Sequence, residues 1–145
     1  MRYGRTIELD TPYEDAVPMV KEAFKEQGFG TLTEIDVKAT LKDKLGEDME
    51  PYVILGACNP QLAHRALEVD RDIGLLLPCN VVVRQAGGKT LVQALDPQVM
   101  VSVPQNDDLQ PIADEAAGRI GRALASLEGE AAAAYIRSHI HPASM

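Results

Sequence analysis

Apolar and polar residues alternate along several short stretches of the chain, a spacing that is typical of half-buried β-strands. A nearly unbroken apolar run over residues 52–57 is typical of a central strand that is buried on both faces. Proline at position 78 interrupts another stretch, which we interpret as two strand-like pieces joined by a bend. The strands predicted from these patterns cover residues 3–9, 31–37, 52–57, 74–77, 81–85 and 90–95.

Between the predicted strands, apolar residues recur every three to four positions, as on the buried face of an amphipathic helix. In the first helix, Thr11 is expected to be the N-cap, Pro12 the first helical residue and Gly28 the C-terminal stop. Pro18 lies inside this helix, so either the helix kinks there or its regular part begins later. The predicted helices cover residues 12–27, 38–45, 61–69 and 109–127, with a further helical piece over residues 130–139 after a break at Gly129.

The order of these elements predicts a two-layer α/β sandwich, with a mixed sheet of about five to six strands and helices packed on one face. Residues 1–128 are expected to form a single α/β domain, and residues 129–145 an Ala-rich C-terminal tail that is helical or mobile. The second face of such a sheet needs cover, which a homodimer made through that face would provide.

The chain has 145 residues and a net charge of −8, which argues against binding to nucleic acid or to an anionic membrane surface. It contains no apolar run as long as a bilayer span, and its N-terminus lacks the apolar region of a signal peptide. Two cysteines in a chain without such a signal fit a reducing compartment, so we expect a cytoplasmic protein.

The main candidate functional residues form a Cys-Asn dipeptide that occurs twice, at Cys58-Asn59 and Cys79-Asn80. Cys58 precedes a predicted helix N-terminus, where amide dipoles lower the pKa of a thiol and favour the thiolate. The alternative is that both cysteines are small buried apolar residues, that Asn59 caps a helix and that Asn80 belongs to a bend.

The two cysteines could also act as a pair, if their strands bring them to one edge of the sheet. They could then form a disulfide, a dithiol switch or half of a metal site. Their spacing of 21 residues is not that of a zinc ribbon, and Asp36, Asp96 or a second subunit would have to supply further ligands. We therefore expect no metal and no cofactor; if a metal were bound, Cys58 and Cys79 would be its first ligands.

A second group of polar residues follows the strand predicted over residues 31–37. Glu34 and Asp36 share one face, and Lys38 continues the alternation, so the three could act as acid, base and counter-ion. The alternative is a solvated face with an ion pair, while Ile35 and Val37 are buried on the other face.

Two long segments resemble a known family. V-I-L-G-A-C-N-P followed by G-L-L-L-P-C-N-V-V-V, and G-F-G-T-L-T-E-I-D-V-K-A-T-L-K-D-K-L-G, are similar to the signatures of the domain of unknown function 302 (DUF302) family. The resemblance covers residues 3–127. It implies a small α/β fold that forms dimers, and it implies no activity. The family-characteristic positions matched here are Glu34, Asp36, Lys38, Gly56, Cys58, Asn59, Pro60, Pro78, Cys79, Asn80, Asp96 and Pro97.

These observations leave three hypotheses for the function. The first is a small-ligand or soft-metal binding or sensing module, whose site is formed by Cys58, Asn59, Cys79, Asn80, Lys38 and Asp96. The second is a thiol-dependent redox enzyme, with Cys58 as nucleophile, Cys79 as resolving thiol and Glu34 or Asp36 as proton carrier. The third is a structural dimerisation domain in which both cysteines belong to the core.

Overall fold

The computed structural model describes residues 3–139, including the side chains of residues 3–130. Five strands form one sheet in the order β1-β5-β4-β3-β2, and every neighbouring pair is antiparallel. The strands are β1 (Gly4–Leu9), β2 (Gly30–Asp36), β3 (Tyr52–Cys58), β4 (Cys79–Ala86) and β5 (Lys89–Leu95). The predicted number of strands is confirmed, but the sheet is antiparallel rather than mixed.

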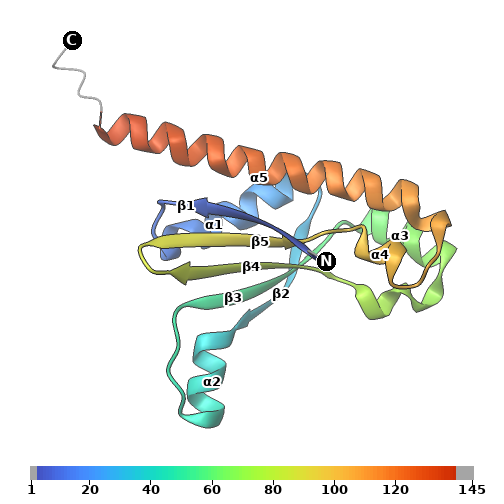
Figure 1. Cartoon of the computed structure of the whole chain (residues 1–145), viewed down its shortest axis with the longest axis horizontal. Helices are drawn as coiled ribbons and strands as arrows, with labels where there is room; N and C mark the ends of the chain where they lie inside the picture. The colour runs from blue at the N-terminus through green and yellow to red at the C-terminus, as the bar shows by residue number, and fades with distance from the viewer. Residues whose placement is uncertain (1–2, 140–145) are drawn as a thin grey trace.

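Helices connect the first four strands along the chain, and a further group of helices follows the last strand, β5 (Figure 1). They are α1 (Tyr13–Glu26), α2 (Val37–Leu45), α3 (Pro60–Val69), the 3₁₀ helix η1 (Arg71–Leu76), α4 (Val99–Ser102), the 3₁₀ helix η2 (Asp107–Leu109) and α5 (Gln110–His139). The strand piece predicted over residues 74–77 is therefore wrong. Its apolar run belongs mostly to η1, in which Ile73 is buried and anchors the turn.

The ends of α1 and α5 also differ from the sequence predictions. Pro12, not Thr11, is the N-cap of α1, and no side chain caps this end. Pro18 is accommodated inside α1 on its exposed side. The break expected at Gly129 is absent, because α5 continues through it to His139. A single glycine costs a helix only about 1 kcal/mol, which favourable neighbouring residues can offset.

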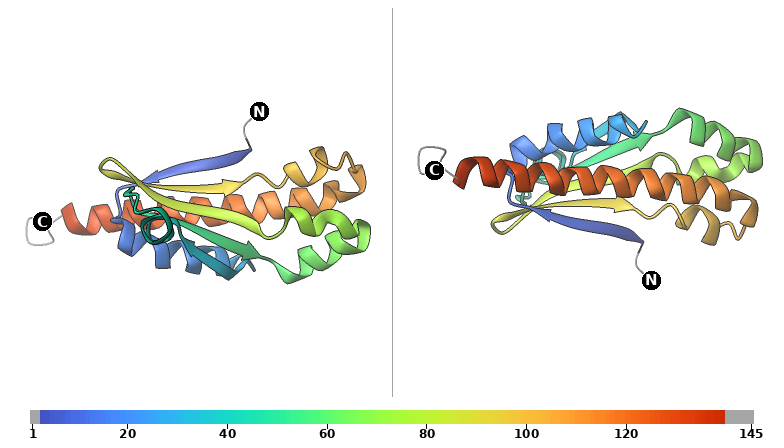
Figure 2. Two further views of the ribbon diagram at one scale, coloured as in Figure 1. Left: turned by 90° about the horizontal axis from the view of Figure 1, so that it is seen from below. Right: turned by 90° about the horizontal axis from the view of Figure 1, so that it is seen from above.

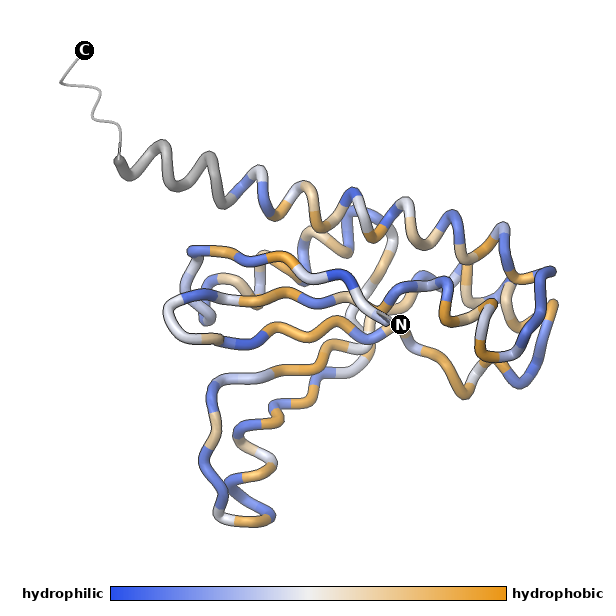
Figure 3. Tube along the Cα trace, in the orientation of Figure 1, coloured by the Kyte–Doolittle hydropathy of each residue, from blue (hydrophilic) through white to orange (hydrophobic). Residues whose placement is uncertain are grey.

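The core lies between the sheet and one layer of helices, so the predicted two-layer α/β sandwich is confirmed. Figure 2 shows α1 and α5 on the same side of the sheet, and the two helices contact each other. Alternate strand residues point into this layer, and Figure 3 shows apolar positions recurring along the strands. The buried residues at the centre of the core include Val20, Leu55, Val81, Val83, Val92, Ile120 and Leu127.

The region of β2 and α2 departs from this pattern. Every residue of β2 is exposed, α2 has no buried residue, and α2 projects away from the body of the molecule (Figure 1). The expected burial of Ile35 and Val37 is wrong, since Ile35 is 48% exposed and Val37 is only half-buried. The reason is that β2 is an edge strand and α2 does not turn back across the sheet.

No helix in the described part of the chain is long and apolar enough to cross a membrane.

Candidate functional site

The first Cys-Asn step joins the end of β3 to the start of α3. Asn59 is 8% exposed, and its side-chain Oδ1 accepts a hydrogen bond of 3.2 Å from the Leu62 N–H. The predicted helix cap is thus confirmed. Its amide also packs against Gly28, where a Cβ would lie 2.8 Å from Asn59 Nδ2. Asn59 therefore connects the end of α1 to the start of α3.

Cys58 does not have the depressed pKa that we expected at a helix N-terminus. Its side chain is half-buried, and this burial raises the pKa of the thiol. The expectation of a lowered pKa is wrong, because the loss of hydration opposes ionisation of the thiol more strongly than the amides at the start of α3 favour it.

The second Cys-Asn step begins β4, and its two side chains point to opposite faces of the sheet. Cys79 is 7% exposed and lies opposite Ala57 of β3. Burial, together with the neighbouring Cys58, raises its pKa to about 11. Asn80 faces the other way and is exposed on the face of the sheet that the helices of residues 3–139 leave uncovered.

Both thiols are free and line one small apolar cavity under the helices. Its volume is about 20 Å³, enough for about one water molecule. Phe29, Leu62 and Met100 complete much of its wall. The neutral thiols behave here as small core residues. Among the side chains of residues 3–130, no group of three His, Cys, Asp or Glu residues is arranged to hold a metal ion.

The acidic residues of β2 have structural partners of their own. Glu34 forms a 2.7 Å ion pair with Lys21 of α1, and Asp36 caps α2 by accepting a 2.9 Å hydrogen bond from the Ala39 N–H. In the β2–β3 register, Cys58 lies opposite Gly30. At about 3.3 Å per residue, Glu34 and Asp36 are therefore roughly 13 Å and 20 Å further along the sheet.

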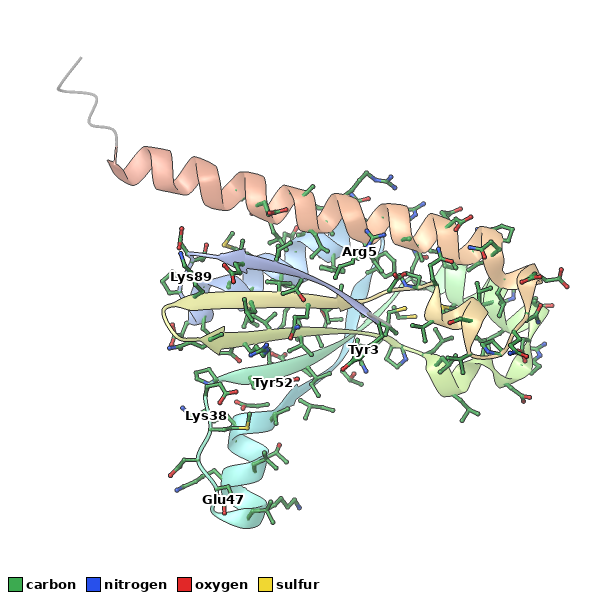
Figure 4. All side chains as sticks on the ribbon, in the orientation of Figure 1. Tyr3, Arg5, Lys38, Glu47, Tyr52 and Lys89 are labelled. Carbon is green, nitrogen blue, oxygen red and sulfur yellow. The ribbon has the colours of Figure 1, made fainter. Side chains whose placement is uncertain are left out.

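Lys38 is exposed on α2, which is the helix that projects from the body. Figure 4 labels its side chain at the base of this arm. The predicted site residues thus lie in three separate places. Cys58, Asn59 and Cys79 lie at the ends of β3 and β4, Lys38 on α2, and Asn80 and Asp96 on the uncovered side of the sheet. Ligand binding by these residues stays a prediction.

The face of the sheet that the described helices leave uncovered, which we call the open face, contains a hollow. This hollow has a volume of about 1030 Å³ and includes Asn80 and Asp96 of the predicted site. Figure 4 labels Tyr3 and Tyr52 on the side of the sheet away from α5. The other residues lining the hollow that carry polar side-chain atoms or aromatic rings are Tyr3, Arg5, Thr6, Tyr52 and Gln93.

A chain of hydrogen bonds crosses three strands on this open face. Arg84 Nε of β4 donates to Gln93 Oε1 of β5 at 2.9 Å, and Gln93 Nε2 donates to Thr6 Oγ1 of β1 at 3.2 Å. These residues were not predicted from the sequence. Their alternation with Val83 and Val92, which are fully buried, was the available signal, because it assigns Arg84 and Gln93 to the same uncovered face.

Comparisons with known proteins bear on the family. A family model described as "Domain of unknown function DUF302" matches residues 5–127. The crystal structure of an uncharacterized conserved DUF302 protein from Bacillus stearothermophilus is similar to this chain, with a TM-score of 0.80 and 32% sequence identity. The similarity covers 86% of this chain and 97% of that one. No curated protein matches. The sequence resemblance is confirmed, and the chain belongs to the DUF302 family.

Proposed function

We propose that the protein is a binding module for a small molecule, and that the ligand occupies the hollow on the open face. The observation that carries this proposal is the size and lining of the hollow. Its volume of about 1030 Å³ is comparable with the roughly 300–1,000 Å³ of small-molecule sites. Polar groups of Asn80, Gln93 and Thr6 converge there beside apolar Val82 and Leu95.

The sequence predicted a ligand site at the cysteine sulfur atoms. The proposed site instead lies on the opposite face of the sheet. Asn80 and Asp96 would contact the ligand, whereas Cys58, Asn59 and Cys79 would support the strand ends from within the core. The thiol-enzyme hypothesis gains no support from the raised pKa of both thiols or from their distance to Glu34 and Asp36. The two free thiols agree with a reducing compartment, and we propose a cytoplasmic location on that basis.

The test is an NMR screen of the isotope-labelled protein against a library of small polar metabolites. We expect saturable shifts of backbone amides around Asn80 and Gln93. Asn80→Trp, which places a large ring in the hollow, should abolish them. His64→Trp is the matched control, because His64 is exposed on α3. If no compound causes saturable shifts in the hollow, or if Asn80→Trp leaves them intact, the proposal is wrong.

A second candidate function is homodimerisation through the open face. Apolar side chains of Tyr52, Ile54, Leu91 and Leu95 are only half-buried there, and Ile35 at the edge is 48% exposed. A second copy would cover this surface, and the projecting α2 would extend its contact area. The family resemblance implies dimers as well.

Analytical ultracentrifugation tests this candidate. Ile54→Glu adds a charge to the middle of the apolar part of the open face and should convert a dimer into a monomer. Val69→Glu is the control, because it alters an exposed apolar residue of α3. A wild-type protein that sediments as a monomer at all accessible concentrations would exclude the dimer.

A further inference from the structure

Arg84 has no ion pair, unlike several other arginines and lysines of the described residues. Lys21, Arg65 and Arg119 each lie within 4 Å of a carboxylate oxygen. Among the described residues, no carboxylate lies this close to Arg84. The other described basic residues for which the structure gives no ion pair are exposed, whereas Arg84 is half-buried, where a guanidinium usually has a partner; the exposed ones are Arg5, Lys25, Lys38, Lys44 and Arg122.

The hydrogen bonds around Arg84 hold the guanidinium while leaving most of its donors free. Its Nε–H is bound to Gln93 Oε1, and Gln93 is in turn oriented by its hydrogen bond to Thr6. The four N–H groups on the two Nη atoms make no hydrogen bond to a described residue. A guanidinium held in this way presents a planar pair of donors, the arrangement that binds carboxylate or phosphate oxygens with two parallel hydrogen bonds.

Arg84 does not itself line the hollow, but the strand register places it directly beside lining residues, with Tyr52 as its partner on β3. Arg84 is two residues from Val82 on the same face of β4, about 7 Å along the strand, and its partner Gln93 lines the hollow directly. The nearest acidic residue in the same row is Glu8 of β1, two strands and roughly 10 Å away. Glu50 lies two residues before Tyr52, the register partner of Arg84, and forms no ion pair with that arginine. Asp96 lies at the opposite end of the hollow, where its Oδ1 accepts the Gln98 N–H.

We propose that the ligand of the hollow is a small oxyanion, whose carboxylate or phosphate group is bound by Arg84 and whose body lies over Val82 and Leu95. This inference rests on the proposed ligand-binding function and adds the chemical class of the ligand. Asp96 excludes a second negative charge at the far end, so that end of the ligand is neutral or carries a hydrogen-bond donor.

The experiment is an NMR titration of the full chain with three probes, namely glutarate monoamide, inorganic phosphate and the neutral glutaramide. We expect at least one anionic probe to shift the signals of Asn80, Gln93 and the Arg84 Nε–H. Its affinity should exceed that of glutaramide by about tenfold to a hundredfold, as expected for charge-assisted hydrogen bonds. Binding of the monoamide alone would indicate a carboxylate ligand, and binding of phosphate alone a phosphate ester. Either result supports the proposal.

Three variants locate the effect. Arg84→Gln should remove the advantage of the anionic probe. Gln93→Glu should do the same, because its carboxylate would replace the amide oxygen beside Arg84 and compete with the ligand. Arg65→Gln is the control, since Arg65 pairs with Glu115 on the helical side and should leave binding unchanged. Amide spectra of each variant report that the fold is intact.

Other outcomes would overturn the inference. If glutaramide binds in the hollow as tightly as the anionic probes, the ligand class is wrong while the binding module stands. If no probe binds in the hollow, Arg84 is no oxyanion site, and the metabolite screen decides separately whether the hollow binds anything. If Arg84→Gln instead dissociates a dimer, Arg84 pairs with a carboxylate of a second copy.

Discussion

The two faces of the sheet are built from the same strands but differ in almost every physical respect. On β4, Val81 and Val83 point toward the helices and are buried, while Asn80 and Arg84 point outward beside the hollow. One face thus supplies the core, and the other presents polar groups oriented by hydrogen bonds. Candidate functional residues in this fold should therefore be sought among the strand residues that point to the open face, and not among the buried residues between them.

The largest contrast is expected between two neighbours on β3. Leu55→Ala should lower the free energy of unfolding by about 2–5 kcal/mol, because Leu55 is 2% exposed and its truncation leaves a cavity. Ile54→Ala, on the open face, should cost less than about 1 kcal/mol, because solvent can fill the space. Urea unfolding measures both. Equal losses would show that something covers the open face, and a second copy is the first candidate.

The next largest effect concerns Cys79 and alkaline pH. Its pKa is raised to about 11 in the folded state, from an ordinary value of 9.0, so folding favours the protonated thiol. Its contribution is fully present below pH 9 and is lost as the pH rises to about 11. A pKa difference of about two units corresponds to roughly 3 kcal/mol.

Urea unfolding between pH 7 and 11 tests this, with Cys79→Ala as the comparison. The wild type should lose more stability than Cys79→Ala over this interval, and other groups that titrate there cancel in the difference. Thiol labelling at neutral pH should reach Cys58 first, since it is only half-buried. Parallel pH profiles, or rapid labelling of Cys79 in the folded protein, would show that the thiol is not enclosed.

The two asparagines provide a smaller contrast. Asn59→Ala removes the cap of α3 and should cost about 0.5–2 kcal/mol. Asn80→Ala should leave stability nearly unchanged, because Asn80 is exposed and caps no helix. Thermal unfolding of the two variants beside the wild type measures the difference. Equal destabilisation would mean that Asn80 also has a structural partner, such as a second copy of the chain.

The smallest effect is expected at Glu34. Its ion pair with Lys21 is exposed, so Glu34→Gln should change stability by about 0–1 kcal/mol, and less at high salt. Urea unfolding at low and high ionic strength measures this. A loss well above this range that persists at high salt would assign Glu34 a role beyond a surface ion pair.

Local sequence signals predicted several elements correctly. The end of α1 just before Gly28 and the cap of α3 by Asn59 both depend on a few consecutive residues. The same is true of the helix predicted to end at residue 45, because α2 ends at Leu45 and is followed by Gly46, whose φ of 68° lies in the left-handed region. Such signals act through backbone sterics and short-range hydrogen bonds, which do not depend on the rest of the fold.

Predictions that depended on distant residues were less successful. The apolar residues 74–77 resembled a strand, yet they mostly form η1, because a short apolar run alone does not distinguish strand from helix. Ile35 was expected in the core, but β2 proved to be an edge strand with every residue exposed. The pKa of Cys58 was expected to fall, but burial that no local pattern reveals raises it.

By itself, the sequence determined the family, a sheet of about five to six strands and the layering of helices on one face, and it predicted a strand over residues 81–85. These follow from periodicity and long matching segments, which the chain carries locally. Only the tertiary structure decided that Cys79 faces the core while Asn80 faces the hollow, and that Arg84, Gln93 and Thr6 meet across three strands. The physical reason is that strand order and register, which bring residues 6, 84 and 93 together, depend on how the whole sheet packs against its helices.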